Sequence, residues 1–244
     1  MTPATRKSSV AWHPIWRVLS DGVDGLLLTG FLLLILVSGC CLYDSFYVYT
    51  HTLDTKEIAR YKPSGSEGDR GTSPIADGMV GWIALDGTDI DYPVMQGEDN
   101  SVFLNKDTYG RFSLSGSIFM DSRNSPAFDD EYTIIYGHHM SYGKMFGALD
   151  SYLDEDYARS HASGMLLIGN DGSERRKLEV FAVAQISAKE RTFFQPGPAE
   201  KVKRLLAARD AMIFHEPAGN IIALTTCAES SVDARILVFC EIRQ

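Results

Sequence analysis

Several common functional motifs are missing from this sequence of 244 residues. It has no P-loop, no glycine-rich dinucleotide fingerprint and no Cys/His spacing typical of a zinc site. It also lacks an internal repeat at the periods of solenoid proteins. These absences argue against three classes of protein that are recognised by their sequence motifs: nucleotide-binding proteins with these motifs, zinc-binding proteins and repeat proteins.

Positive charge is also scarce. Lys and Arg number 23 against 32 Asp and Glu, which gives a net charge of −9. A general nucleic-acid binder needs clustered Lys and Arg to neutralise phosphates, so this class is disfavoured. The apolar fraction of 45% is ordinary for a globular protein. The length allows one sizeable domain with attached segments.

Cysteine is too rare for a disulfide scaffold, with four in the whole chain. Cys40 and Cys41 are adjacent at the end of an apolar run, where lipid packing or acylation explains them better than a bridge. Cys227 and Cys240 remain, and an unpaired thiol in an exported protein calls for an explanation. A disulfide between these two is one interpretation, and a functional thiol is the other.

The N-terminal part contains a long apolar run. No charge occurs from Gly25 to Tyr43, and a helix of this length crosses the bilayer core of about 30 Å. The run is longer than the apolar region of a usual signal peptide, and no clean cleavage site follows. We therefore predict a retained anchor, with a cleaved signal as the alternative.

Flanking charges predict the orientation of this anchor. Arg6, Lys7 and Arg17 precede it, whereas the nearest positive charge after it, Lys56, is more distant. The positive-inside rule then favours a cytoplasmic N-terminus. We expect the protein in the cell membrane as a single-pass protein, with the rest of the chain outside.

The predicted organisation has four parts. Residues 1–24 form a short cytoplasmic tail and residues 25–43 the transmembrane anchor. Residues 44–74 form a helical segment followed by a linker rich in Gly and Ser. Residues 75–244 form the main domain.

The main domain reads mostly as short apolar strands separated by Gly, Asn and Asp. Asp86-Gly87 is typical of a hairpin turn, and Asn170 to Glu174 of a turn between paired strands. About eight strands with few long helices favour a mainly β, closed or nearly closed barrel without exposed edges. One late helix is predicted from Pro198 to Asp210, and a shorter one within residues 151–161.

Three features could carry chemistry. Cys227 ends the apolar run "IIALTTC", His138 and His139 follow the apolar run "YTIIYG", and Arg235 opens the run "RILVFCEI". An imidazole can activate a thiol, and an arginine can stabilise the oxyanion of acyl transfer. Taken singly, each has a plainer interpretation: a buried thiol, a solvated histidine pair and a surface cation.

Strand alternation separates the two late cysteines. In an extended strand Arg235 shares one face with Leu237 and Phe239. Cys240 falls on the opposite face with Ile236 and Val238. We therefore predict that Cys240 lies in the core and does not act as a resolving thiol.

These residues together resemble the sortases, the membrane-anchored cysteine transpeptidases of Gram-positive bacteria. The resemblance rests on "LTTC" followed by an arginine, on "YGHHM…MFGAL", and on "GWIALDGTDIDYPVMQGEDNSVFLNKDTYGRFSLSGSIFMDSRNS", which is similar to class B. It covers roughly Tyr43 to Ile242. It implies a closed eight-stranded β-barrel with N-terminal helices and a helix inserted before the last two strands, preceded by one transmembrane helix.

The resemblance also implies roles for single residues. Cys227 is expected as the nucleophile, His138 as the general acid/base and Arg235 as the oxyanion-stabilising group, with His139 only a neighbour. Further residues match positions that line or adjoin the substrate groove of the family, or could orient the triad. These are Thr225, Thr226, Asn105, Leu104 and Glu229. No metal and no cofactor are expected.

The implied activity is cleavage of a C-terminal Pro- and Thr-containing sorting signal after its Thr, through a cysteine acyl-enzyme. The expected partners are secreted proteins with this signal and the amine of the peptidoglycan precursor, lipid II. A pilus-type sortase with a lysine acceptor is the alternative. An L,D-transpeptidase, a papain-like protease and an inactive tethered binding module are less compatible with the residues above.

Overall fold

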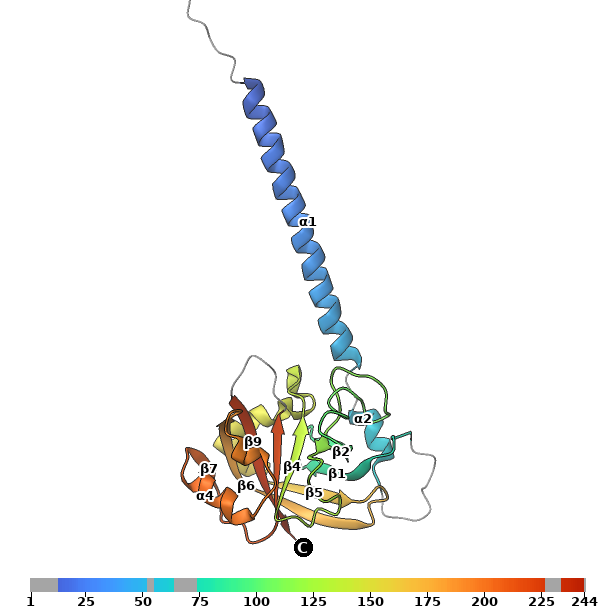
Figure 1. Cartoon of the computed structure of the whole chain (residues 1–244), viewed down its shortest axis with the longest axis vertical. Coiled ribbons are helices and arrows are strands. Elements are labelled where there is room, and N and C mark those ends of the chain that lie inside the picture. Colours follow the sequence, from blue (N-terminus) through green and yellow to red (C-terminus); the bar gives the residue numbers. More distant parts are fainter. Residues whose placement is uncertain (1–12, 52–54, 64–73, 227–233, 244) are drawn as a thin grey trace, which may run out of the picture. The chain divides into compact units, whose positions relative to one another are not determined.

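The structure is a computed structural model and describes residues 13–51, 55–63, 74–226 and 234–243 (Figure 1). Two compact units are present, Met1–Thr50 and His51–Gln244. Cys227 and Glu229, both predicted site residues, lie outside the described residues.

The described part of the first unit is one long helix. Helix α1 runs from His13 to His51, and within it Asp21–Tyr43 is long and apolar enough to cross a membrane. Its apolar side chains are exposed to the surroundings, as expected for a helix that meets lipid. The helix continues past Tyr43 without a break, so the predicted boundary between anchor and helical segment is not a helix end.

The segment before the barrel is helical in two short pieces, α2 (Thr55–Ile58) and η1 (Ala59–Tyr61). Ile58 is fully buried in the core of the second unit. Lys62 Nζ and Trp82 Nε1 both donate to Asp91 Oδ1, at 2.7 and 2.6 Å. The segment therefore packs against the barrel as part of the same unit.

The second unit is built on one closed sheet (Figure 1). Its strands are β1 (Met79–Leu85), β2 (Asp91–Met95), β3 (Phe119–Met120), β4 (Tyr132–Gly137), β5 (Ser163–Ile168), β6 (Glu174–Ser187), β7 (Ala211–Ile213), β8 (Ile221–Thr226) and β9 (Ala234–Arg243). The order is β5-β1-β2-β3-β4-β8-β9-β6-β7, and an additional β5–β6 pairing joins the ends. Eight strands thus close the barrel and β7 is added outside it. The predicted fold class is confirmed.

Local turn chemistry explains two connections of the barrel. Gly87 lies at φ +74° in the turn between the antiparallel strands β1 and β2. Gly169 and Gly172 have φ values of 82° and 63° between β5 and β6. Glycine populates this left-handed region at no steric cost, so the predictions of both turns are confirmed.

Helices interrupt the strands in the second half of the chain. These are η2 (Ser141–Gly143), η3 (Phe146–Leu153), α3 (Glu155–Ser160), η4 (Arg191–Phe194) and α4 (Ala199–Ala207). Helices α3 and α4 confirm the two helices expected from the sequence, and α4 precedes β8 and β9 as the inserted helix. Strand β7 was not expected, because three residues are too short to show an alternation.

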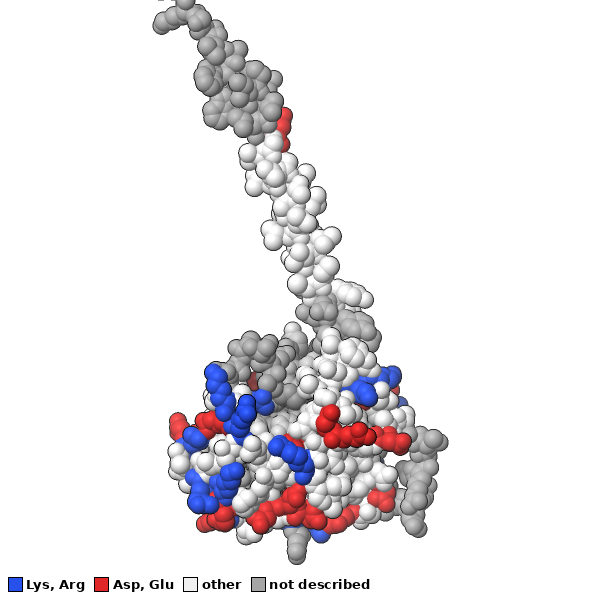
Figure 2. Space-filling model, in the orientation of Figure 1, with Lys and Arg blue, Asp and Glu red and all other residues white. Residues whose placement is uncertain are grey.

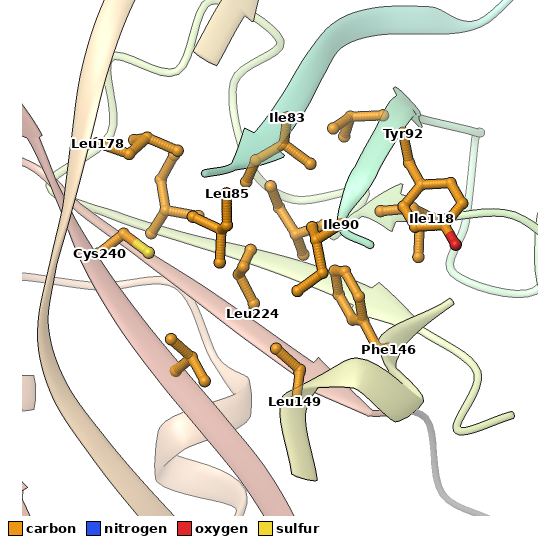
Figure 3. Close-up of a cluster of buried hydrophobic side chains, with 14 of the residues drawn as sticks. Ile83, Leu85, Ile90, Tyr92, Ile118, Phe146, Leu149, Leu178, Leu224 and Cys240 are labelled. Atoms are coloured by element: carbon orange, nitrogen blue, oxygen red, sulfur yellow. The ribbon is translucent and has the colours of Figure 1, made fainter. Parts of the chain in front are cut away.

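Two clusters of buried side chains lie on opposite faces of the strands. The interior cluster receives residues from all eight barrel strands, among them Ile83, Leu178, Leu224 and Cys240 (Figure 3). The outer cluster is formed by one side of the barrel together with Phe193 of η4 and Val202 and Leu206 of α4. In β4, β8 and β9, alternate positions supply the two clusters.

Candidate active site

The predicted histidine and cysteine follow two neighbouring strands. Strands β4 and β8 are parallel, and their register pairs Gly137 with Thr226, the last residue of each. His138 is the next residue after β4, and Cys227 is the next residue of the sequence after Thr226. The fold therefore ends both strands at one edge of the barrel.

Arg235 reaches the same edge from β9. Strands β8 and β9 are antiparallel and pair Thr225 with Leu237, so Arg235 lies beyond this pair in the direction of Thr226. Leu237 belongs to the outer cluster, and Arg235 shares its face by alternation. The parallel register places Tyr136 beside Thr225 on this face as well. The structure thus brings His138 and Arg235 to the same end of the barrel.

The backbone before His138 requires a glycine. A Cβ at Gly137 would lie 2.4 Å from Ile118 Cδ1 and 2.8 Å from the ring of Phe146. After the strand, the carbonyl of His138 accepts a hydrogen bond from Phe146 N at 3.0 Å. His138 is half-buried. Its backbone is restrained by the close packing at Gly137 before it and by the hydrogen bond to Phe146 of η3.

His139 has a different environment. It is exposed, and its Nε2 lies 2.8 Å from Asp150 Oδ2. Both side chains are about half exposed, at 45% and 53%. The two adjacent histidines therefore differ in burial, and their separate roles stay a prediction.

The guanidinium of Arg235 lies over an aromatic ring. Its Cζ is 4.7 Å from the centroid of Phe194, the last residue of η4. Phe194 is half-buried and packs against the outer cluster. This distance is typical of a cation–π contact.

Beneath this face lies a buried carboxylate, Asp121, with no exposed surface. Arg123 donates to it through Nε at 2.8 Å and Nη2 at 2.7 Å. Asn100 Nδ2 and the Tyr136 hydroxyl donate to its Oδ2 at 3.0 and 3.1 Å. Burial alone raises the pKa of Asp121, but these hydrogen bonds outweigh it and hold the pKa below its usual value.

Tyr136 is the residue two positions before His138. Burial, and then the negative charge of Asp121, raises the pKa of its phenol well above the usual value. It therefore stays a neutral donor to Asp121 at any physiological pH. Nothing in the sequence pattern singled out Tyr136, Asp121 or Phe194, because the contacts from Tyr136 to Asp121 and from Arg123 to Phe194 join positions that are distant along the chain.

The remaining predicted residues differ in accessibility. Thr225 and Thr226 are buried, and Thr225 Oγ1 donates to the Thr226 carbonyl at 3.4 Å. Leu104 is half-buried against the outer cluster, in the connection between β2 and β3. Asn105 is exposed, and its carbonyl accepts from Ser113 N at 3.1 Å. Leu104 therefore shares the face of Tyr136 and Arg235, whereas the two threonines present little surface.

Charge is unevenly distributed over the surface (Figure 2). Lys and Arg gather over the part of the second unit that contains β7 and α4, and Asp and Glu follow its lower edge in this view. Within the described part of the chain, no group of three or more His, Cys, Asp or Glu side chains could hold a metal ion.

Comparison with known proteins agrees with this geometry. A family model described as the sortase domain matches residues 83–243. Sortase B of Listeria monocytogenes is 37% identical over 131 residues, which are 53% of this chain and 52% of that protein. The chain thus spans about half the length of the curated relatives it matches.

Solved structures match over a larger part of the chain. A mutant form of Clostridium perfringens sortase B has a TM-score of 0.66 and 26% identity, and covers 78% of this chain and 97% of that one. A Streptococcus pyogenes class B sortase involved in pilus biogenesis has a TM-score of 0.62 and 30% identity, with coverages of 69% and 94%. This chain belongs to the sortase family, and its relatives are class B sortases.

Proposed function

We propose that this protein is a membrane-anchored cysteine transpeptidase that cleaves a C-terminal sorting signal after its Thr. It would then join the released carbonyl to a peptidoglycan amine. The observation that carries the proposal is the register Gly137–Thr226, together with the pair Thr225–Leu237. His138 and Cys227 each follow the first pair by one residue, and Arg235 lies two residues before Leu237 in β9. These are the residue types that acyl transfer requires.

The first half-reaction forms a thioester. The thiolate of Cys227 attacks the carbonyl carbon of the Thr in the signal, and the negative charge moves to the carbonyl oxygen. Arg235 donates to this oxyanion through its planar, permanently charged guanidinium. His138, as the imidazolium, gives its proton to the leaving nitrogen while the C–N bond breaks.

The second half-reaction resolves the thioester. His138, now neutral, accepts a proton from the incoming amine as this attacks the thioester carbonyl. The C–S bond breaks and the thiolate of Cys227 is restored. Arg235 again stabilises the tetrahedral oxyanion, so the same groups serve both half-reactions.

The N-terminal helix gives this chemistry a location. The span Asp21–Tyr43 would fix the enzyme in the cell membrane, with the N-terminus in the cytoplasm and the barrel outside. Secreted substrates and the lipid-linked precursor both arrive at this surface. Neither a metal nor a cofactor takes part in the mechanism we propose.

One relative favours a second candidate. The Streptococcus pyogenes class B sortase with 30% identity is involved in pilus biogenesis. A pilus-building enzyme would use the same thioester but would pass it to a lysine of another pilin. The difference lies in the acceptor and leaves the roles of Cys227, His138 and Arg235 unchanged.

A trapping experiment tests the proposal. The full chain in detergent micelles is incubated with a library of Pro- and Thr-containing signal peptides, and its intact mass is measured. We expect a thioester adduct on Cys227 that ends in Thr and is released by hydroxylamine. An adduct elsewhere, or turnover without an adduct, would contradict the mechanism.

The acceptor is then tested separately. The trapped enzyme receives either a peptidoglycan cross-bridge amine or a pilin peptide that contains lysine. Release of the adduct by the cross-bridge amine alone supports the cell-wall reaction. Release by the lysine peptide alone supports the pilus reaction in its place.

A further inference from the structure

A line of contacts connects a buried carboxylate to Arg235. Phe194 is the central member, because its ring and its backbone are held by two different arginines. Its ring centroid lies 4.7 Å from Cζ of Arg235. Its carbonyl accepts a hydrogen bond from Nη2 of Arg123 at 2.9 Å.

Hydrogen bonds from the barrel hold the backbone of Phe194 and of the residue before it. The guanidinium of Arg123 that donates to the carbonyl of Phe194 is also bound through two nitrogens to Asp121, which fixes its plane. The preceding carbonyl, that of Phe193, accepts from the hydroxyl of Tyr132 in β4 at 2.7 Å. Two successive carbonyls of η4 are thus tied to the barrel, so the backbone that carries the ring of Phe194 is held in place.

Asp121, at the other end of this line of contacts, is held rigidly by its hydrogen bonds. Asp121 is fully buried, and its carboxylate accepts from Arg123, Asn100 and Tyr136. A buried carboxylate with this many donors remains ionised and holds its partners in one arrangement. Arg123 therefore acts as a bridge between the barrel and η4.

We propose that Phe194 is the positioning residue for Arg235, and that the Asp121–Arg123 pair holds Phe194 in place. The ring covers one face of the guanidinium, so the side chain spends less time in other rotamers and its N–H groups keep one direction. Stabilisation of an oxyanion depends on donors that are oriented before the reaction. The inference rests on the proposed function, since it assigns Arg235 to the oxyanion.

Two substitutions of Phe194 separate the ring from simple burial. Phe194→Leu keeps an apolar side chain but removes the aromatic face, whereas Phe194→Tyr keeps the face. In the full chain in micelles, we expect Phe194→Leu to lower the kcat of acylation by about tenfold, with KM changed much less. Phe194→Tyr should retain kcat within about twofold. Equal losses in both variants would contradict the positioning role.

The chain offers a matched control. Arg159 lies over the ring of Phe214 at the same distance, 4.7 Å. The N–H of Phe214 donates to the carbonyl of Phe181 in β6. The neighbour of Phe181, Val180, pairs with Cys240, which in turn pairs with Ile222 near the start of β8. This contact therefore lies away from the end of β8 that precedes Cys227. Phe214→Leu removes an equivalent contact and should leave kcat unchanged. A similar loss of kcat in this variant would show that Phe194→Leu acts through general destabilisation.

A coupling measurement tests whether Phe194 acts through Arg235. In an Arg235→Ala background, Phe194→Leu should cause no further loss of residual acylation, because the group it positions is gone. Independent and multiplicative losses would overturn the inference. If Arg235→Ala has wild-type activity, the proposed function is at fault, and the positioning role is judged by the spectroscopic arm below.

The spectroscopic arm does not need activity. Arginine-selective ¹⁵N labelling gives one Nε–Hε signal per ordered arginine, and the signal of Arg235 is identified by its loss in Arg235→Lys. We expect a ring-current shift of this signal that disappears in Phe194→Leu and persists in Phe194→Tyr. An Arg235 signal at the same position in all three proteins would overturn the proposed contact.

Discussion

The two faces of β9 differ in chemistry although they belong to the same strand. Ile236, Val238 and Cys240 point into the closed barrel and join the interior cluster. Leu237 and Phe239 point to the outer cluster, and Arg235 opens that face. The interior surroundings keep a thiol neutral, whereas the outer face carries a cation and a network of polar donors. Odd and even positions along this strand therefore give a side chain very different surroundings.

Cysteine shows the contrast most clearly. Burial raises the pKa of the Cys240 thiol to about 12, so it is neither a nucleophile nor a metal ligand at neutral pH. Cys240 is a free thiol with no exposed surface, which disfavours the disulfide with Cys227. The prediction that Cys240 lies in the core is confirmed. The role of Cys227 stays a prediction.

The largest expected effect distinguishes these two cysteines. Cys227→Ala should abolish acyl-enzyme formation, a loss of about 10⁴-fold or more, because no other thiol can replace the nucleophile. Cys240→Ala should retain turnover. The measurement is the intact mass of the full chain after incubation with a signal peptide. A persistent adduct in Cys227→Ala would place the nucleophile elsewhere.

The adjacent histidines give the next effect. His138→Ala should lower kcat by about 10³-fold, because the leaving amine loses its proton donor. His139→Ala should change kcat by less than about threefold, since it removes only an exposed contact with Asp150. Steady-state kinetics of the two variants provide the comparison. The assignment is wrong if His139→Ala is the inactive variant.

Arg235→Lys tests whether the planar guanidinium of Arg235 contributes to the reaction beyond its positive charge. The substitution keeps the positive charge but loses the planar fork, so we expect a fall in kcat of about 10²-fold. Single-turnover acylation rates, measured at saturating peptide, report this step directly. Unchanged rates would make Arg235 a structural residue.

The smallest effect concerns stability and the interior face. Cys240 keeps its proton in the folded state up to pH about 12, whereas an unfolded thiol loses it near its ordinary pKa of about 8.5. Above that pH the unfolded state binds fewer protons, so the free energy of unfolding falls as pH rises. Between pH 9 and 10 we expect a fall of about 1 kcal/mol from this residue.

Denaturant unfolding of the wild type and Cys240→Ala measures this contribution. The pH dependence between 9 and 10 should be weaker in the variant, although the variant is less stable at pH 7. Tyr92, whose pKa burial raises to about 12, contributes in the same direction only above its ordinary pKa of about 10. Identical slopes in both proteins would mean that Cys240 reaches solvent in the folded state.

Local patterns were sufficient for much of the fold. The uncharged run from Gly25 to Tyr43, the turn at Asp86-Gly87 and the alternation from Arg235 to Cys240 each depend on neighbours in sequence. The helix α4 was predicted from its apolar spacing and its proline. The same local signals placed His138, Cys227 and Arg235 at strand ends.

Other features depended on contacts between distant segments. The parallel pairing of β4 with β8, and the closure of the barrel by β5 and β6, follow from strand order and register, which alternation does not encode. The β7 strand forms because the edge of β6 is available to it. The line from Asp121 through Arg123 and Phe194 to Arg235 joins the β3–β4 connection, η4 and the start of β9.

The sequence by itself therefore determined which residues follow or open each strand, and on which face of β9 Arg235 and Cys240 lie, because side-chain direction in a strand alternates with a period of two. Only the tertiary structure decided which strand ends meet, and which aromatic ring lies under Arg235. The physical reason is that partners far apart in the chain meet only through packing and backbone pairing of the whole barrel.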